Sequence, residues 1–313
     1  MLLLLGTRAS ALAKWQAEWV AARLRERGHT VELVLIATQG DATQGPIAES
    51  SEGAPIAGLG TVGVFTKELQ RALLEGRIDL AVHSLKDLPT DPIEGLTLAA
   101  VPERESPFDV LLSRAGHRLD ELPERAIIGT GSLRRRAQLL HVRPDLRMAD
   151  IRGNVDSRLR KLHEGQFDAL VLAEAGLSRL GFAEQITQIL SPDVMLPAVG
   201  QGALGIETRT ADLATRSVVE LLNDRLSHAA VVAERELLSA LRGGCLAPVG
   251  AYAQLIDPGS LRLRSIVFSA DGNQKLLAES TGSAEVCREL GRRVAEELLA
   301  GGAAKLIALA RST

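Results

Sequence analysis

Short runs of apolar residues alternate with amphipathic stretches along most of the chain, a pattern typical of α/β proteins. Residues 2–5 form a continuous apolar run that predicts a buried strand. The spacing of Leu12, Trp15 and Trp19 then predicts a helix that ends near Gly28. Further strands are expected at 31–37, 78–82, 96–101, 109–112, 126–128, 146–151 and 169–173.

One strand-to-helix turn carries an unusual concentration of positive charge. Residues 129–136 read Gly-Thr-Gly-Ser-Leu-Arg-Arg-Arg, and Ser132 is a suitable helix N-cap. Arg134, Arg135 and Arg136 then fall in the first helical turn, where the helix dipole already presents partial positive charge. Because an anion would offset that charge, the turn predicts an anion site. A solvated basic surface turn is the alternative.

The N-terminal turn has a similar construction. Gly6 and Thr7 follow the first predicted strand, and Arg8 and Ser10 precede the first helix. The recurrence indicates two similarly built α/β halves, each offering a helix N-terminus to a shared cleft. Gly-Thr turns are also common in unrelated α/β proteins, so the similarity alone does not establish a repeat.

Polar residues also stand where other predicted strands end. The strand at 78–82 is followed by His-Ser-Leu-Lys-Asp at 83–87, and open α/β sheets bind ligands at the carboxyl ends of their strands. Asp87 precedes a Leu-Pro pair, so a simple turn is the alternative interpretation. Three more arginines lie at strand ends or in the helical stretches after them: Arg152, Arg158 and Arg179.

Segments containing proline or glycine mark the places where the chain changes domain. Residues 102–107 predict a crossing into a second domain, and residues 196–207 predict the return. Two helices, three strands and a last helix follow and complete a smaller third unit. The expected domains are 1–102 with 203–221, 103–202, and 222–313. Residues 38–63 lack periodicity and form a loop long enough to act as a lid.

Composition limits the classes of partner. The 313 residues include 36 basic and 39 acidic side chains, a formal net charge of −3, but residues 129–161 hold nine Arg or Lys against three Asp. Only 3% of residues are aromatic and no recognition motif is present, so we expect no nucleic-acid partner. No run approaches the roughly 20 apolar residues that span a bilayer, and residues 2–5 are too short for a secretory signal. We therefore expect a cytoplasmic protein without membrane contact.

The cysteines and histidines indicate neither a disulfide framework nor a metal site. The two cysteines are Cys245 and Cys287, and the six histidines show no metal-ligand spacing. Cys287 shares a predicted helical face with Leu290 and Val294, which favours a core position. Cys245 follows two glycines in a loop without a helical face, and either a reactive or a small buried thiol fits this setting.

Five motifs together resemble the porphobilinogen deaminase, or hydroxymethylbilane synthase, family. They are Thr-Arg-Ala-Ser at 7–10, His-Ser-Leu-Lys-Asp at 83–87, Gly-Thr-Gly-Ser-Leu-Arg-Arg at 129–135, Leu-Pro-Ala-Val-Gly-Gln-Gly at 196–202 and Gly-Gly-Cys at 243–245. The resemblance covers nearly the whole chain. It implies two periplasmic-binding-protein-like (type II) lobes with an active cleft between them, and a smaller α+β C-terminal domain carrying the cysteine loop.

The resemblance also implies the reaction and the residues that perform it. Four porphobilinogens condense head to tail, with loss of ammonia, on a dipyrromethane cofactor that Cys245 holds through a thioether. Asp87 is the implied catalytic residue. The other implied cofactor-binding residues are Ser84, Lys86, Ser132, Arg134 and Arg135. The implied substrate-binding residues are Arg8, Ser10, Thr130, Arg152, Arg158, Arg179 and Gln201. Porphobilinogen and the growing oligopyrrole chain are the expected partners, and we expect a monomer.

Elementary chemistry agrees with these roles. Each pyrrole carries an acetate and a propionate, and the forked donors of arginine bind carboxylates bidentately. A carboxylate such as Asp87 can stabilise the cation left when ammonia departs and assist proton transfer. One departure from the family is the loop after the second strand, because no Lys or Arg occurs between Arg27 and Lys67. We therefore do not expect charged contacts from this loop to the substrate.

Two other classes of protein compete with this interpretation. A two-lobed solute-binding module would use the same cleft and arginines without chemistry, but leaves Asp87 and Cys245 unexplained. A nucleotide-binding enzyme would suit the glycine-rich turns, yet neither a G-x-G-x-x-G nor a P-loop pattern is present.

Overall fold

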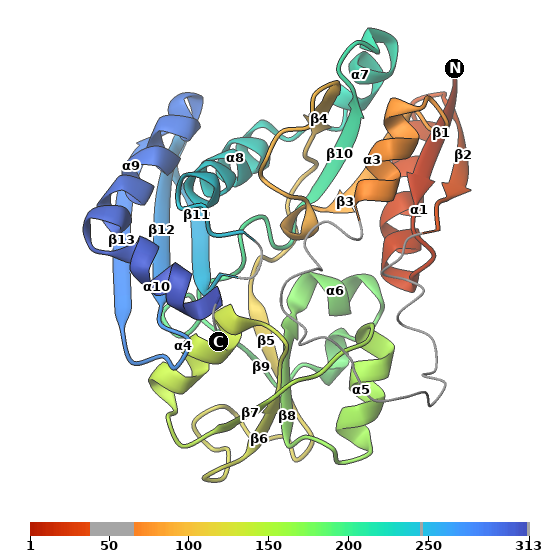
Figure 1. Ribbon diagram of the computed structural model, residues 1–313. Coiled ribbons are helices and arrows are strands. Elements are labelled where there is room, and N and C mark those ends of the chain that lie inside the picture. The colour runs from red at the N-terminus through yellow and green to blue at the C-terminus, as the bar shows by residue number, and fades with distance from the viewer. Residues whose placement is uncertain (38–65, 245–246, 312–313) are drawn as a thin grey trace, which may run out of the picture. The chain divides into compact units, whose positions relative to one another are not determined.

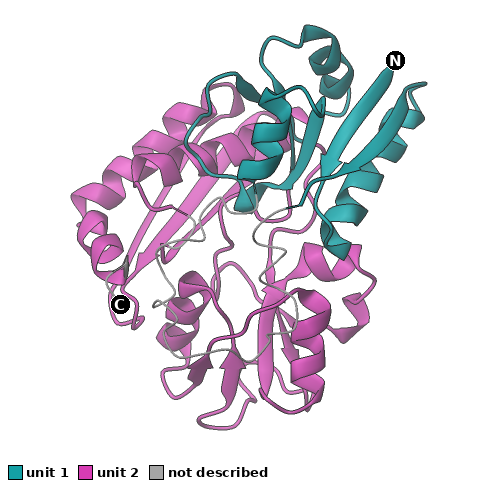
Figure 2. Cartoon of the chain, turned by 45° about the vertical axis from the view of Figure 1, so that its right-hand side comes forward, with its two compact units in different colours: residues 1–101, 204–223 teal, residues 102–203, 224–313 magenta. Residues whose placement is uncertain are grey.

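A computed structural model describes residues 1–37, 66–244 and 247–311. Contacts divide the chain into two compact units, Met1–Val101 with Leu204–Asn223 and Pro102–Ala203 with Asp224–Thr313 (Figure 2). The lid expected at 38–63 and the anchor expected at Cys245 lie outside the described residues. The division into three domains stays a prediction, although unit 2 contains two separate sheets.

Unit 1 is built on a five-stranded mixed sheet. Its strands are β1 (Leu2–Thr7), β2 (Thr30–Leu35), β3 (Leu80–Ser84), β4 (Leu96–Ala100) and β10 (Leu204–Arg209), in the order β2-β1-β3-β10-β4. β1 pairs in parallel with β2 and β3, whereas β10 is antiparallel to both β3 and β4. The return segment predicted from sequence thus supplies an internal strand of the first sheet.

Helices cover this sheet with apolar faces. They are α1 (Ala11–Arg25), α3 (Lys67–Leu74) and α7 (Leu213–Glu220) (Figure 1). Val20 and Leu24 of α1 join Leu3 and Leu5 of β1 in one core, and Leu69 and Leu73 of α3 form a second core. Continuous apolar strands suit this arrangement because a sheet covered by helices is buried on both faces.

Unit 2 contains a second five-stranded sheet with the same topology. Its strands are β5 (Asp109–Ser113), β6 (Ile127–Gly129), β7 (Arg147–Ala149), β8 (Ala169–Ala173) and β9 (Gln188–Ile189), in the order β7-β6-β8-β5-β9. β6 is parallel to β7 and β8, and β5 is antiparallel to β8 and β9. Its helices are α4 (Leu133–Val142), α5 (Val155–His163) and α6 (Glu174–Arg179), with a short 3-10 turn η2 (Ala183–Gln185). The two similarly built α/β halves expected from sequence are therefore confirmed.

The correspondence between the two sheets extends to single residues. Gly6 is the second-last residue of β1, and Gly129 is the last residue of β6. A Cβ added to Gly6 would lie 2.3 Å from Ile78 Cδ1, and a Cβ added to Gly129 would lie 2.5 Å from Leu170 Cδ2. Glycine suits both places because a Cβ there would meet the end of a neighbouring side chain, which would have to move. The segments before β3 and β8 also correspond: residues 75–79 read Glu-Gly-Arg-Ile-Asp and residues 164–168 read Glu-Gly-Gln-Phe-Asp.

The rest of unit 2 is a three-stranded antiparallel sheet packed against helices. The strands are β11 (Val249–Asp257), β12 (Ser260–Phe268) and β13 (Lys275–Ser283). The helical elements are α8 (Arg225–Ala240), the 3-10 turn η3 (Ala284–Val286), α9 (Cys287–Ala300) and α10 (Ala303–Arg311). Sequence analysis expected one last helix, but the described chain ends with two, because Gly302 adopts φ +98° between α9 and α10. The predicted fold class, two α/β halves and a smaller α+β part, is confirmed.

Two details differ from the expected local structure. His83 and Ser84 lie inside β3, and a 3-10 turn η1 (Leu85–Asp87) follows directly. Cys287 is half-buried at the start of α9, where it packs against the core of the three-stranded sheet. Within the described ranges, no helix combines the length and apolar character needed to cross a bilayer.

Candidate functional site

Three helices begin at the carboxyl ends of parallel strands, and each has a side-chain N-cap. The Ser10 hydroxyl accepts a hydrogen bond from Ala13 N (3.3 Å), and the Ser132 hydroxyl accepts one from Arg135 N (3.5 Å). Asn154 caps α5 by accepting from Ser157 N (3.0 Å). The cap role predicted for Ser132 is confirmed, and the structure shows that Ser10 has the same role in α1.

The carboxyl end of β3 presents the predicted catalytic segment of unit 1. Asp87 is the last residue of η1 and is exposed, whereas Lys86 is half-buried. Ser84 is held from α1, because Gln16 Nε2 donates to its hydroxyl oxygen at 2.8 Å. Arg8 and Ser10, which follow β1, are half-buried at the edge of the same sheet. An exposed carboxylate on a short fixed turn is available to a ligand.

A buried polar cluster lies directly before this segment. His83 Nε2 is 3.1 Å from Glu207 Oε2, and Gln70 Nε2 donates to Glu207 Oε1 at 3.1 Å. All three side chains are buried. Sequence analysis missed Glu207 and Gln70, since 137 residues separate them and neither stands in a polar motif.

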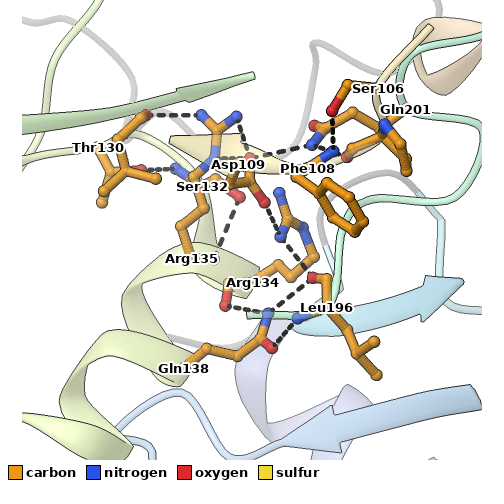
Figure 3. A network of polar contacts seen from close by, with 12 residues as sticks. Ser106, Phe108, Asp109, Thr130, Ser132, Arg134, Arg135, Gln138, Leu196 and Gln201 are labelled. Carbon is orange, nitrogen blue, oxygen red and sulfur yellow. Dashed lines mark hydrogen bonds and ion pairs between the residues drawn. The ribbon is translucent and has the colours of Figure 1, made fainter. Parts of the chain in front are cut away.

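The arginine-bearing turn of unit 2 is organised around a buried carboxylate (Figure 3). Arg134 Nη1 donates to Asp109 Oδ2 at 2.6 Å. Arg135 Nε donates to Asp109 Oδ1 at 2.9 Å, and Arg135 Nη2 lies 2.7 Å from the same oxygen. Asp109 is fully buried and both guanidinium groups are nearly so. The first turn of α4 therefore already contacts one anion, which the chain itself supplies.

Neighbouring groups complete the network. Gln201 Nε2 donates to Asp109 Oδ1 at 3.0 Å and to the carbonyl of Pro107 at 2.7 Å. Arg134 Nη1 also donates to the carbonyl of Leu196 (2.7 Å), and Arg135 Nη1 donates to that of Val171 (3.0 Å). Burial alone would raise the pKa of the Asp109 carboxyl, but the two guanidinium groups and the hydrogen bonds hold that pKa well below its usual range.

Asp109 was not among the residues singled out from the sequence. It was expected only as the first residue of a strand. Its signal is a single acidic residue opening the otherwise apolar stretch Val110 to Leu112, but that signal does not identify the partners. The turn at 129–136 is therefore positively charged as the sequence predicted. The structure adds the Asp109 carboxylate, which neutralises part of that charge from inside the protein.

The other predicted residues of unit 2 lie on the turns after β6 and β7, in the helices α5 and α6, or on a connecting segment. Thr130 is buried, and its hydroxyl accepts from Ser132 N at 3.2 Å. Thr130 N donates to Ala149 O at 2.9 Å, so the turns after β6 and β7 are adjacent. The second turn carries Arg152, which is exposed, and leads to Arg158, whose Nε donates to the carbonyl of Gly153 at 2.8 Å.

Arg179 contacts the connection between domains predicted at 196–207. Its Nη2 donates to the carbonyl of Gly202 at 2.7 Å, and burial lowers the pKa of its guanidinium while Glu105 opposes that effect. Gly202 adopts φ +85°, and an added Cβ would lie 2.4 Å from the carbonyl oxygen of Glu105. The two predicted connecting segments therefore touch each other beside Arg179.

The structure thus brings the predicted residues together in two groups. Unit 2 holds eight of them on the turns after β6 and β7, in α4, α5 and α6, and on a connecting segment: Thr130, Ser132, Arg134, Arg135, Arg152, Arg158, Arg179 and Gln201. Unit 1 gathers Arg8, Ser10, Ser84, Lys86 and Asp87 at the carboxyl ends of β1 and β3.

The duplicated sheet topology, with cationic and capping residues at the carboxyl strand ends, defines a duplicated α/β protein of the kind suited to anionic ligands. Residues 3–217 match the family model described as "Porphobilinogen deaminase, dipyromethane cofactor binding domain", and residues 228–300 match "Porphobilinogen deaminase, C-terminal domain". The chain belongs to the porphobilinogen deaminase family.

Individual relatives agree over nearly the full length. The porphobilinogen deaminase of Desulforudis audaxviator is 49% identical over 309 residues, covering 98% of this chain and 97% of that protein. The porphobilinogen deaminase of Chlorobaculum parvum is 46% identical over 316 residues, covering 99% and 98%. Because these relatives are named as enzymes, the alternative of a binding module without catalysis is not favoured.

Solved structures with similar chains are more distant. A Salmonella typhimurium periplasmic binding protein with high arginine specificity has a TM-score of 0.40 at 14% identity, covering 72% of this chain and 93% of that one. Lipoprotein Tp32 of Treponema pallidum has a TM-score of 0.42 at 11% identity, covering 70% and 88%.

Proposed function

We propose that this protein condenses four porphobilinogen molecules head to tail, with release of ammonia, into the linear tetrapyrrole hydroxymethylbilane. The reaction proceeds on a dipyrromethane cofactor that Cys245 holds through a thioether. The observation that supports this function best is the buried Arg134–Arg135 pair at the start of α4, in a chain of this family.

The residues of unit 2 fit a ligand rich in carboxylates. Two guanidinium groups face a single internal carboxylate, so the pair keeps one positive charge at a helix N-terminus. Exposed Arg152 stands on the adjacent turn and half-buried Arg158 in α5, while Arg179 ends α6 and contacts the connecting segment that carries Gln201. These side chains bind and orient the acetate and propionate groups of the cofactor, the substrate and the growing chain, helped by Thr130 and Ser132.

The residues of unit 1 take the chemical role. The exposed carboxylate of Asp87 stabilises the positive charge that develops on the pyrrole as ammonia departs, and it accepts or returns the pyrrole proton. Lys86 and Ser84 bind cofactor, and Arg8 and Ser10 bind substrate carboxylates. The bound dipyrromethane primes the chain, and a thioether at Cys245 suits that task because it is not hydrolysed during a cycle.

The intact mass of the purified protein tests this function directly. The wild type is expected to be heavier than its sequence by one dipyrromethane, and Cys245→Ala is expected to show the bare mass and no porphobilinogen consumption. Cys287→Ala is the matched control, since it removes the other cysteine of the chain and should keep the added mass. An active wild type with the bare mass would reject the cofactor assignment. A monomeric state and a cytoplasmic location stay predictions.

A further inference from the structure

Asp109 is a fully buried carboxylate that the mechanism above does not use. It opens β5, beside the carboxyl end of β8, with which it pairs through Ala173. Its two oxygens accept from Arg134, Arg135 and Gln201. A carboxylate removed from water to this degree is stable only with such partners, and each partner is fixed in return.

The charges around Asp109 do not cancel. One carboxylate faces two guanidinium groups, and the remaining contacts of the pair are with neutral carbonyl groups of Leu196 and Val171. The N-terminus of α4 adds partial positive charge at the same place. One positive charge is therefore left over in a region from which water is largely excluded, and such a charge favours one additional anion.

The two arginines differ in how their donors are used. Arg135 contributes Nε and Nη2 to Asp109 and Nη1 to Val171. Arg134 contributes only Nη1, which donates to both Asp109 and the carbonyl of Leu196. Among the described residues, Nε and Nη2 of Arg134 have no hydrogen-bond partner, although the side chain is 95% buried. Figure 3 shows this guanidinium group beside Asp109. These two nitrogens form one edge of the guanidinium, the geometry that binds a carboxylate bidentately.

We propose that Asp109 is a positioning residue of the cofactor site, which locks one side of Arg134 and Arg135 and leaves a single guanidinium edge for one ligand carboxylate. This inference rests on the proposed function. Asp109 itself does not touch the ligand. It sets the orientation of the open edge and reduces the charge of the pair, so that the cluster takes one carboxylate and not two.

Chemical rescue of Asp109→Ala tests this role, because truncation leaves a space that formate can fill. The apoprotein is incubated with porphobilinogen, and the fraction that gains the cofactor mass is measured with formate or with chloride at equal ionic strength. Without formate the loaded fraction at a fixed time should fall about 10-fold or more relative to wild type, given the cost of leaving buried charges without their partner. Formate should restore loading, and chloride should not.

Leu139→Ala provides a matched control in the same helix. Leu139 is fully buried and outside the polar network, so this change lowers stability without altering the donors of Arg134. It should load normally and show no formate effect. Formate should also raise the melting temperature of Asp109→Ala apoprotein more than chloride does, a readout independent of cofactor.

If Asp109→Ala fails to fold, two other variants are compared. One carries Asp109→Asn alone, and the other carries both Asp109→Asn and Arg135→Gln. The double variant restores the single excess charge and keeps Arg134, so it should load better than the single variant. Wild-type loading in Asp109→Ala, no advantage of formate over chloride, or equal loading of the single and double variants overturns the positioning role. A wild type that never gains the cofactor mass instead refutes the proposed function.

Discussion

Asp79 and Asp168 occupy the same position in the two five-stranded sheets, immediately before β3 and β8. Asp79 Oδ2 accepts from Leu4 N at 2.9 Å, and Asp168 Oδ2 accepts from Ile127 N at 2.8 Å. In return, Asp79 N donates to the carbonyl of Leu4 at 2.8 Å, and Asp168 N donates to the carbonyl of Ile127 at 2.9 Å. In both sheets, therefore, an aspartate side chain links the residue before one parallel strand to the neighbouring parallel strand: β3 to β1 in the first sheet and β8 to β6 in the second.

Removing the aspartate side chain should lower the free energy of unfolding by different amounts in the two units. Asp79→Ala and Asp168→Ala should each lower the free energy of unfolding by about 1–2 kcal/mol, because a backbone N–H loses its partner. Asp79→Ala should cost more, since Asp79 also lies 3.0 Å from Arg209 Nη2, whereas Asp168 lies 3.8 Å from the more exposed Arg114. Urea denaturation measures both, and a larger effect at Asp168 would contradict this assignment.

Alanine should be poorly tolerated at the paired glycines. Gly6→Ala and Gly129→Ala place a Cβ within 2.5 Å of a side-chain carbon and should each destabilise the protein by about 1–3 kcal/mol. Gly282→Ala is the strand control, because its Cβ would meet Leu290 Cδ1 at 3.6 Å, an ordinary contact. Thermal unfolding compares the three, and equal melting temperatures would mean that the close approach is easily relieved.

Asp87→Asn should fold and keep the cofactor but lose most turnover. Asp87 is exposed on η1, so the change leaves packing intact while removing the charge that acts on the pyrrole. A loss of porphobilinogen consumption of about 100-fold or more is expected for a general acid–base group. Intact mass checks cofactor retention, and near-normal consumption would remove Asp87 from its proposed role.

Arg152→Leu should separate carboxylate binding from folding. Arg152 is exposed on the turn after β7, so its replacement should leave stability unchanged and slow priming or elongation by about 10-fold, the value of one charge-assisted hydrogen bond. Arg160→Leu on α5, also exposed, is the control and should retain normal rates. Unchanged kinetics and a normal distribution of chain-extension intermediates in Arg152→Leu would count against its role. Arg135→Leu is less informative, because it also breaks the contact with Asp109.

The Asp109 carboxylate should make stability depend on acid pH. Its pKa in the folded protein lies below the ordinary value of about 3.9, so its contribution is complete above that pH and is lost as the pH falls toward the folded pKa. Asp109→Asn should reduce the free energy of unfolding by about 3–5 kcal/mol at pH 7. The difference in free energy of unfolding between wild type and variant should shrink below about pH 4. Denaturation between pH 7 and pH 2.5 measures this difference, and a constant difference would show that Asp109 does not titrate in this way.

Local sequence was sufficient for the helix starts and for most strands. Ser10 and Ser132 act on N–H groups three residues away, so their role as caps depends on little else. Continuous apolar runs likewise identified β1 and β8, because strands covered on both faces need apolar residues at every position. The repeated Glu-Gly-x-apolar-Asp segments at 75–79 and 164–168 were a further signal of duplication that sequence analysis did not use.

Tertiary structure alone decided which charges meet. Asp109 is 25 and 26 residues from Arg134 and Arg135, and Glu207 is 124 residues from His83. Such pairs depend on the antiparallel pairing of β5 with β8 and of β10 with β3, strands that are distant from each other along the chain. A sequence pattern records the propensity and charge of each residue, so it predicted positive charge at the start of α4. The carboxylate that meets this charge is selected by long-range strand pairing, which local patterns do not encode.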